Sequence, residues 1–338
     1  MKKLISLICV LAMVLALAAC GSSAPAAATE APAASTEAPA EDVSADKTFV
    51  VGICQLVQHV ALDAATQGFK DALTEALGDK VTFQEQNASG DSATCSLICN
   101  QFVSDEVDLI MANATASIQA AASATNTIPI LGTSITDYGV ALGVDNWTGV
   151  SGTNISGTSD LAPLDGQAAM IQELFPDAKT IGLLYCSGEP NSIFQADSME
   201  ALLTDMGYSV ERYTFADSND VSSVTANACS NSDVLYIPTD NTAASCTEAI
   251  NNVALSAGIP IVAGEEGIAS GCGVATLSIS YYDLGRATGE MAAEILTGGA
   301  DVSTMEVRFA PAFTKEYNAD ICEALNITVP DDYVAIAK

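Results

Sequence analysis

The sequence predicts an α/β fold built from two doubly wound parallel-sheet lobes joined by a hinge. Three observations predict it. Strands and helices alternate along the chain, the alternation starts again in the second half, and aliphatic residues are frequent whereas aromatic residues make up only 6%. Crossover helices between successive strands imply a parallel sheet, and buried parallel strands are rich in Val and Ile.

The first half opens with a strand at Phe49–Leu56, followed by apolar residues at helical spacing between Leu62 and Leu77. The elements that follow are strands at Val81–Gln86, Leu109–Ala112 and Ile128–Gly132, with helices at Cys95–Val103 and Ser117–Thr125. This βαβα order predicts one parallel sheet.

The second half repeats the pattern and ends with a further helix at Tyr281–Leu296 and an apolar segment at Met305–Phe309. Its predicted strands are Thr180–Cys186, Ser209–Tyr213, Val234–Ile237 and Ile259–Ala263, and its predicted helices are Ile193–Met206, Val221–Ala228 and Thr242–Ala257.

Two pairs of segments show that the halves are duplicates. Asp108–Asn113 matches Asp233–Pro238, and Ile128–Ile130 matches Ile259–Ile261, at nearly equal offsets. Ligands of open parallel sheets bind outside the carboxyl ends of the strands, so two facing lobes predict a cleft that a hinge can close. The predicted lobes are 47–152 plus about 281–308, and about 153–280 plus 309–338, with hinges near Ser151–Gly157, Thr276–Ser280 and Phe309–Pro311.

The N-terminus predicts export. Two lysines precede an apolar run, Leu4–Ala19, which ends in small residues before Cys20, as in a secretory signal peptide covering residues 1–19. The segment resembles the lipobox of bacterial lipoproteins, which implies lipidation of Cys20; a plain signal peptide with an incidental Cys20 is the alternative. Residues 20–46 are rich in Ala, Pro, Ser, Thr and Glu, which predicts a disordered tether.

Composition excludes several classes of function. A net charge of −31 argues against nucleic-acid binding and favours solubility. Metal ligation is not expected because His59 is the only histidine, and no cofactor is expected. Eight cysteines follow Cys20, and we expect mostly free, buried thiols, although disulfides are permitted outside the cytoplasm. They are Cys54, Cys95, Cys99, Cys186, Cys229, Cys246, Cys272 and Cys322.

Several blocks together resemble a known family. They are Val51–His59, Ala61–Asp63, Gly68-Phe69, Ser187–Ser192, Ile237–Thr242, Ala263–Gly267 and Tyr281–Gly285. They look like blocks of the bacterial ABC-transporter substrate-binding proteins that include tryptophan and other aromatic amino-acid binders. The resemblance implies a type I periplasmic-binding-protein fold and work beside a permease and its ATPase. Val60 stands where the family pattern has Pro, and Cys is unusually frequent.

Strand ends of the first lobe supply hydroxyl and amide groups. Thr115 and Ser117 open a helix, where free backbone N–H groups suit an anion, so we expect a carboxylate clamp there; N-capping is the alternative. Remoter similarity to branched-chain amino-acid binders supports the clamp. Ser134 can add a hydroxyl, and Asp137 can cap the next turn. The predicted ligand-binding residues of this lobe are Gln58, His59, Asn87, Thr115, Ser117, Thr133 and Thr136.

The second lobe offers carboxylates at the matching strand ends. Asp240 is the preferred partner for a ligand ammonium, since charge-assisted hydrogen bonds are about twice as strong as neutral ones. Each acid could instead cap a helix or stay solvated. The predicted ligand-binding residues here are Glu189, Asn191, Asp240, Asn241 and Glu265.

No catalytic motif accompanies these residues. Neither a nucleophile elbow around a plausible nucleophile nor a G-x-x-x-x-G-K phosphate loop is present, so an enzyme is not expected. We expect an extracytoplasmic lipoprotein, monomeric and held to the membrane by lipid alone, that captures a small zwitterion for an ABC importer. An amino acid is favoured, and the resemblance implies an aromatic one. A sugar, nucleoside or peptide binder and a ligand-sensing module for a membrane receptor are the alternatives.

Overall fold

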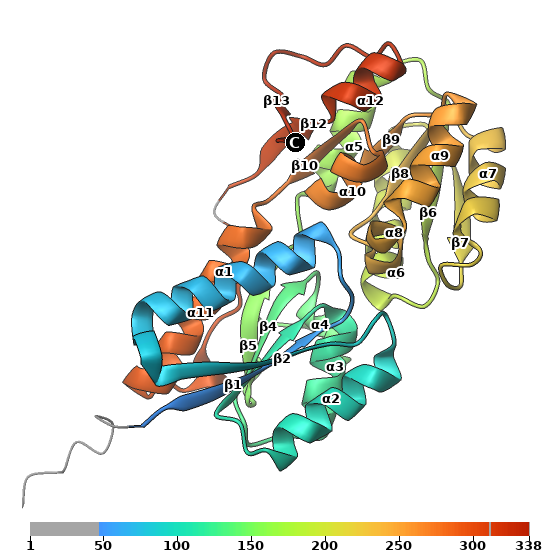
Figure 1. Ribbon diagram of the computed structural model, residues 1–338. Helices are drawn as coiled ribbons and strands as arrows, with labels where there is room; N and C mark the ends of the chain where they lie inside the picture. Colours follow the sequence, from blue (N-terminus) through green and yellow to red (C-terminus); the bar gives the residue numbers. More distant parts are fainter. Residues whose placement is uncertain (1–46, 311, 338) are drawn as a thin grey trace, which may run out of the picture. The chain divides into compact units, whose positions relative to one another are not determined.

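Two parallel-dominated sheets, each with helices on both faces, make up the chain in the computed structural model (Figure 1), which describes residues 47–310 and 312–337. The predicted signal peptide, Cys20 and the tether lie outside the described residues, and so does Pro311 of the third predicted hinge. Within the described ranges, no helix is both long and apolar enough to cross a membrane. The α/β fold class predicted from the sequence is confirmed.

The first sheet is parallel throughout. Its strands, in spatial order, are β11 (Arg308–Phe309), β5 (Ile155–Ser159), β4 (Ile130–Ile135), β3 (Leu109–Asn113), β1 (Phe49–Gln55) and β2 (Val81–Asn87). The order reverses between β1 and β3, which is the kind of switch point where doubly wound sheets bind ligands.

The second sheet repeats this order and adds a C-terminal edge. Its strands are β13 (Val334–Ala335), β12 (Thr314–Tyr317), β10 (Ala275–Ser278), β9 (Ile261–Ala263), β8 (Val234–Ile237), β6 (Thr180–Cys186) and β7 (Ser209–Phe215). Only β10 and β12 pair antiparallel among the described strands. Since β2-β1-β3-β4-β5 and β7-β6-β8-β9-β10 have the same arrangement, the predicted duplication is confirmed.

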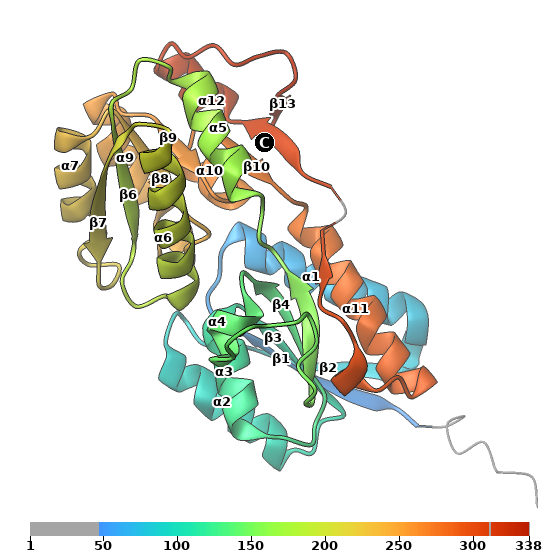
Figure 2. The same ribbon diagram turned by 180° about the vertical axis from the view of Figure 1, so that it is seen from behind.

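Helices cover both faces of each sheet. They are α1 (Val60–Leu77), α2 (Ser92–Ser104), α3 (Thr115–Ala124), α4 (Tyr138–Leu142), α5 (Leu164–Leu174), α6 (Pro190–Asp205), α7 (Val221–Asn231), α8 (Asn241–Ser245), α9 (Thr247–Ala257), α10 (Glu266–Cys272), α11 (Tyr281–Gly298) and α12 (Ala319–Ala324), with short 3₁₀ turns at Gly78–Lys80 and Val302–Thr304. Helices α1 and α11 cover one face of the first sheet, and α2 and α3 the other. On the second sheet, α5 and α6 lie on the face seen from behind (Figure 2), opposite α7, α9 and α10.

Helix α11 returns from the second half of the chain to pack directly on α1. A Cβ atom added at Gly68 would lie 2.0 Å from the carbonyl oxygen of Tyr282, and one added at Gly285 would lie 2.0 Å from that of Ala65. The two helices therefore need a glycine on each side of their contact. Both glycines belong to the sequence blocks that resemble the family.

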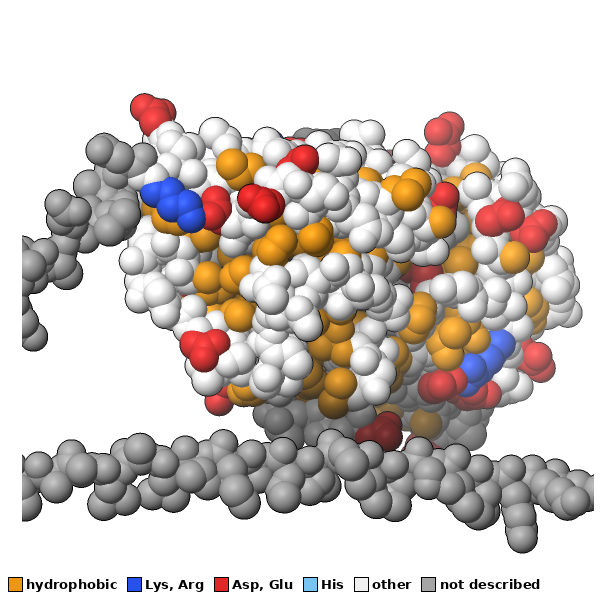
Figure 3. Space-filling model, turned by 90° about the horizontal axis from the view of Figure 1, so that it is seen from below, with side chains coloured by type: hydrophobic (Ala, Val, Ile, Leu, Met, Phe, Trp, Pro, Cys, Tyr) orange, Lys and Arg blue, Asp and Glu red, His pale blue; other side chains and the backbone are white. Residues whose placement is uncertain are grey.

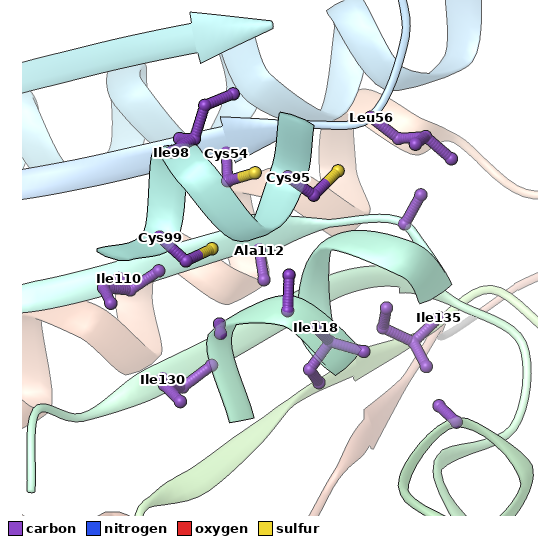
Figure 4. Close-up of a cluster of buried hydrophobic side chains, with 14 of the residues drawn as sticks. Cys54, Leu56, Cys95, Ile98, Cys99, Ile110, Ala112, Ile118, Ile130 and Ile135 are labelled. Carbon is purple, nitrogen blue, oxygen red and sulfur yellow. The ribbon is translucent and has the colours of Figure 1, made fainter. Parts of the chain in front are cut away.

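Three cysteines share the core between the first sheet and α2 (Figure 4). Cys54 and Cys95 each lie near the hydroxyl of Ser117, with sulfur–oxygen distances of 3.7 and 3.6 Å. All eight cysteines of the described ranges are free, and all except Cys246 are buried. The prediction of mostly free, buried thiols is confirmed.

The boundary between the two sheets lies later than the sequence predicted. Residues assigned to the second lobe from about 153 include β5, which pairs with β4 and β11 of the first sheet and is fully buried. The predicted hinge at Ser151–Gly157 overlaps this strand. The local sequence, Ser151–Gly157, has little apolar periodicity, and neighbouring strands on both sides hold β5 in place. The division into lobes stays a proposal, with its first crossing between Ser159 and Leu164.

The individual helices and strands differ less from the sequence predictions than the lobe boundary does. The helix predicted at Thr242–Ala257 is two helices, α8 and α9, separated at Cys246. Strands β1, β3, β6 and β8 lie where they were predicted, within one residue at either end. Asp137 caps α4 as predicted, since its carboxylate accepts a hydrogen bond from the Val140 N–H at 2.8 Å.

Candidate functional site

A pocket lies where the carboxyl ends of both sheets come together. It is lined by His59, Leu62, Ser134, Thr136, Asp160, Asn191, Thr239, Asp240, Asn241, Ala244, Glu265 and Tyr281. His59 follows β1, Thr136 follows β4 and Asp160 follows β5, whereas Asp240 follows β8 and Glu265 follows β9. Ligand pockets of open α/β sheets form at such strand ends.

Three buried carboxyl groups give the pocket its electrostatic character. Burial raises the pKa of Asp160 to about 6 and that of Glu265 to about 7. Burial and, to a smaller degree, the nearby charge of Glu189 also raise the pKa of Asp240. None of the described lining residues is a Lys or Arg, so no basic side chain neutralises these acids. The described residues contain no cluster of three or more His, Cys, Asp or Glu side chains arranged to hold a metal ion.

Basic side chains are instead engaged at the surface. Arg286 pairs with Glu75 and Arg308 with Glu294, at 2.6 and 2.8 Å. The surface in Figure 3 shows scattered Asp and Glu side chains and few Lys or Arg. None of the ion pairs in the described ranges involves Asp160, Asp240 or Glu265, so no Lys or Arg of the described residues forms a salt bridge with these three acids.

Two of the three acids already have a structural task. Asp240 accepts hydrogen bonds from the N–H groups of Ala243, at 2.8 Å, and Cys186, at 2.7 Å. Both carboxylate oxygens of Glu265 accept N–H groups in the first turn of α10. Asp240 and Glu265 therefore act as helix caps, which was the alternative left open for them.

Asp160 caps no helix, and hydrogen bonding with the Tyr281 and Thr136 side chains and with its own backbone N–H partly opposes the rise in its pKa. Its Oδ2 atom accepts a hydrogen bond from the Tyr281 hydroxyl at 2.9 Å. Its Oδ1 atom is buried and has no hydrogen-bond partner in the described part of the chain. A buried carboxylate oxygen without a donor is costly, so this atom is the strongest candidate for a ligand contact.

A bulge in β4 aims a hydroxyl at the pocket. The register between β4 and β5 shifts between Gly132 and Ile135, and Ser134 has a left-handed φ of 56°. Bulges re-aim side chains, and strained backbone of this kind gathers at functional sites. The Ser134 hydroxyl is buried and has no partner within the described ranges. The N-terminus of α1, beside the pocket at His59 and Leu62, has no side-chain cap.

His59 contacts the opposite side of the pocket. Its Nε2 atom lies 3.3 Å from Oδ1 of Asn241, whose Nδ2 group donates to Glu189 at 2.8 Å. Burial lowers the pKa of His59, although the hydrogen bond with Asn241 and the charges of Glu189 and Asp63 act in the opposite direction. His59 is therefore neutral at neutral pH.

The structure brings six of the predicted ligand-binding residues to this pocket. They are His59, Thr136, Asn191, Asp240, Asn241 and Glu265. Glu189 lines an adjoining hollow that shares Asn241 with the pocket. It holds the start of α8, because its carboxylate accepts the N–H groups of Asn241 and Thr242 at 2.9 and 2.8 Å.

The other predicted residues lie elsewhere. Thr115 and Ser117 are buried at the start of α3 and are not among the residues lining the pocket; Ser117 contacts the cysteine cluster instead. Thr133 accepts a hydrogen bond from Thr158 at 3.3 Å inside the sheet. Gln58 and Asn87 are exposed and do not line the pocket, and Asn87 stabilises its own turn through the Ser89 N–H.

Sequence reasoning missed Asp160, Tyr281, Leu62, Thr239 and Ala244 as lining residues. Asp160 had a usable signal, because it follows a strand as His59 and Asp240 do. It was overlooked because β5 was read as a hinge. Tyr281 belongs to a block that resembles the family, but nothing local indicates that its hydroxyl meets Asp160.

A family model described as ABC transporter substrate binding protein matches residues 50–338. The chain belongs to this family. Its members are solute-binding proteins that work outside the cytoplasm with an ABC transporter, and they are not enzymes. The family predicted from the sequence blocks is confirmed.

Named relatives extend this result. The substrate-binding protein is 39% identical over 251 residues to a tyrosine-binding protein of Clostridioides difficile, covering 73% of this chain and 72% of the relative. A solved ABC domain of Streptococcus pneumoniae in complex with L-Trp is 31% identical, with a TM-score of 0.80 over 84% of this chain and 97% of its own. The type I periplasmic-binding-protein fold is thereby confirmed.

A third relative was solved without ligand. It is the open structure of a Clostridium difficile substrate-binding protein with adhesive properties, 37% identical to this substrate-binding protein. The match covers 86% of this chain and 99% of the relative, with a TM-score of 0.66.

Proposed function

We propose that this protein captures an aromatic amino acid outside the cytoplasm and delivers it to the permease and ATPase of an ABC importer. The observation that carries the proposal is the unpartnered Oδ1 atom of Asp160, in a pocket with acids and no Lys or Arg among its described lining residues. An ammonium group suits such an atom, because it donates charge-assisted hydrogen bonds to a carboxylate oxygen. The relatives that hold tyrosine and L-Trp support the aromatic class.

The ligand carboxylate has a separate place. The Ser134 hydroxyl is an unpartnered donor, and the first N–H groups of α1 have no intrahelical acceptor. A helix N-terminus attracts an anion through these N–H groups and its dipole. This replaces the clamp expected at Thr115 and Ser117, whose helix does not line the pocket.

Closure of the two lobes around the ligand is part of the proposal. Two hydrogen bonds cross the pocket, from His59 to Asn241 at 3.3 Å and from Gln195 to Thr136 at 3.4 Å. The chain also matches the L-Trp complex, at a TM-score of 0.80, better than the more similar open relative, at 0.66. Both observations support a closed arrangement reached by a hinge.

Lipid anchoring through Cys20 completes the proposal. Its support is the sequence alone, in which small residues precede Cys20 and a Pro- and Ala-rich segment follows it. We expect an alkyne-labelled fatty acid to label the wild-type protein in cells and not the Cys20→Ser variant. Equal labelling of both proteins would remove the anchor from the proposal.

A thermal-shift screen tests the ligand class. We expect tyrosine or tryptophan, at about 100 times its dissociation constant, to stabilise the protein by about 2.7 kcal/mol. The screen also includes sugars and nucleosides, which represent the alternative ligand classes. Tyramine and tryptamine, which lack a carboxylate, test whether that group is needed for binding. A shift with a sugar and none with an amino acid would overturn the proposal. An equal shift with tyramine would show that the acidic pocket selects an amine.

A further inference from the structure

His59 lines the pocket and carries a hydrogen-bond acceptor that no described protein group uses. Its Nδ1 atom is buried and has no partner in the described ranges, although His59 lies at the N-terminus of α1, where side chains often cap. Buried polar atoms are almost always paired in native proteins, so an unpaired one in a ligand pocket calls for an external donor.

The orientation of the Asn241 amide determines which nitrogen of the His59 ring carries the proton. Its Nδ2 group lies 2.8 Å from a carboxylate oxygen of Glu189. A carboxylate accepts hydrogen bonds, so the amide nitrogen must face Glu189 and the amide oxygen must face His59. The same carboxylate accepts the N–H and hydroxyl of Thr242, at 2.8 and 2.7 Å, which holds Glu189 in place.

The Asn241 amide oxygen can only accept a hydrogen bond. Nε2 of His59, which lies 3.3 Å from that oxygen, therefore carries the proton and donates it. In a neutral imidazole the second nitrogen then has a bare lone pair. Glu189 and Asn241 thus fix the histidine tautomer from the opposite side of the pocket. Nδ1 can accept a hydrogen bond from a ligand and cannot give one.

Three residues that line the pocket each carry a buried atom without a partner in the described ranges, and the chemistries of these atoms differ. Asp160 Oδ1 is a carboxylate oxygen, the Ser134 hydroxyl is a donor, and His59 Nδ1 is a neutral acceptor. On the proposed function, the first takes the ammonium and the second the carboxylate. We propose that His59 determines specificity by accepting a hydrogen bond from the ligand side chain, so that the protein selects an aromatic amino acid with a ring N–H or O–H donor. Tyrosine and tryptophan have such a donor, and phenylalanine has none.

Paired ligands test this inference. Titration calorimetry would compare tyrosine with phenylalanine, and tryptophan with benzothienylalanine, in which sulfur replaces the indole N–H. We expect wild-type protein to prefer the donor ligand by at least about 10-fold in at least one pair, because a site built to hydrogen-bond a donor is left unpaired by the analogue. His59→Leu should reduce that preference to about 3-fold or less, by weakening the donor ligand alone. His59→Gln, which retains an acceptor, should restore part of it.

Nitrogen-15 NMR detects the contact between His59 Nδ1 and the ligand directly. The chain has one histidine, so protein labelled with nitrogen-15 histidine and purified without a histidine tag gives the signals of His59 alone. We expect a non-protonated Nδ1 whose resonance moves on binding the donor ligand and not its analogue. Gln67→Leu, on the exposed side of α1, is the control and should leave both readouts unchanged.

The outcomes separate the two proposals. Binding of both members of each pair with equal affinity, or equal weakening of both by His59→Leu, would overturn the specificity role; equal weakening would mean that Nδ1 accepts from the ammonium. A protonated Nδ1 in the spectrum would also overturn it. If none of the four ligands binds, the proposed aromatic amino-acid function fails, and this inference fails with it.

Discussion

Asp160→Asn is expected to weaken binding of the amino-acid ligand by about 100-fold or more while leaving the protein folded. The substitution keeps the shape of the side chain and the acceptor for Tyr281, but removes the charge that the ligand ammonium requires. Breaking a buried charge pair by removing one partner costs about 3–5 kcal/mol, which exceeds a 100-fold loss in affinity. Titration calorimetry at pH 8 measures the change.

Although Asp160→Asn should weaken ligand binding, it should not lower the thermal stability of the ligand-free protein. Burial raises the pKa of Asp160 to about 6, above its unfolded value, so the ionised carboxylate destabilises the folded state once the pH rises through this range. At pH 8 the neutral amide of the variant avoids that cost. We therefore expect the ligand-free Asp160→Asn variant to melt at a temperature equal to or above that of the wild type.

The matched control is Asp137→Asn, an acid near the pocket that caps α4 and does not line the site. It should leave the affinity unchanged, because Asn caps helices as well as Asp does. Loss of binding in Asp240→Asn with retention in Asp160→Asn would contradict the assignment. The ammonium would then lie at Asp240, as the strand-end pattern of the sequence predicted.

Gly285→Ala is expected to destabilise the fold by about 3 kcal/mol. Its new Cβ atom would lie 2.0 Å from the backbone oxygen of Ala65, so α1 and α11 must move apart. Backbone cannot yield as a flexible side chain does, and overpacking of this kind costs about 1–3 kcal/mol or more. Chemical denaturation of the ligand-free protein measures the free energy of unfolding.

Gly298→Ala provides the control on the same helix. A Cβ atom there would meet nothing within 4 Å, and Ala is better than Gly inside a helix by about 1 kcal/mol. The control should be neutral or stabilising. Equal, small effects at both positions would mean that α1 and α11 are loosely packed and can separate at little cost, contrary to the close contact at Gly285.

The sequence alone predicted the architecture because its determinants are local. Alternation of apolar periodicities located strands such as Thr180–Cys186, and the repeated Ile-Pro-Ile segments revealed the duplication. It failed at β5, because that strand is specified by its neighbours β4 and β11 and not by its own composition. The error then hid Asp160, which a correct strand assignment would have placed at a strand end.

Half of the predicted site followed from the same local rule, since strand ends such as His59 and Asp240 do meet at the pocket. By itself, the sequence determined the fold, the family and the kinds of polar groups at the strand ends. Only the tertiary structure decided which of these groups are free for a ligand. Asp240 and Glu265 are engaged as caps, a bulge turns Ser134 inward, and Tyr281 meets Asp160. The Glu265 cap is local, and capping was an alternative that the sequence left open. The bond between Asp240 and Cys186, the bulge at Ser134 and the contact between Tyr281 and Asp160 depend on segments far apart in the chain, and no local pattern encodes them.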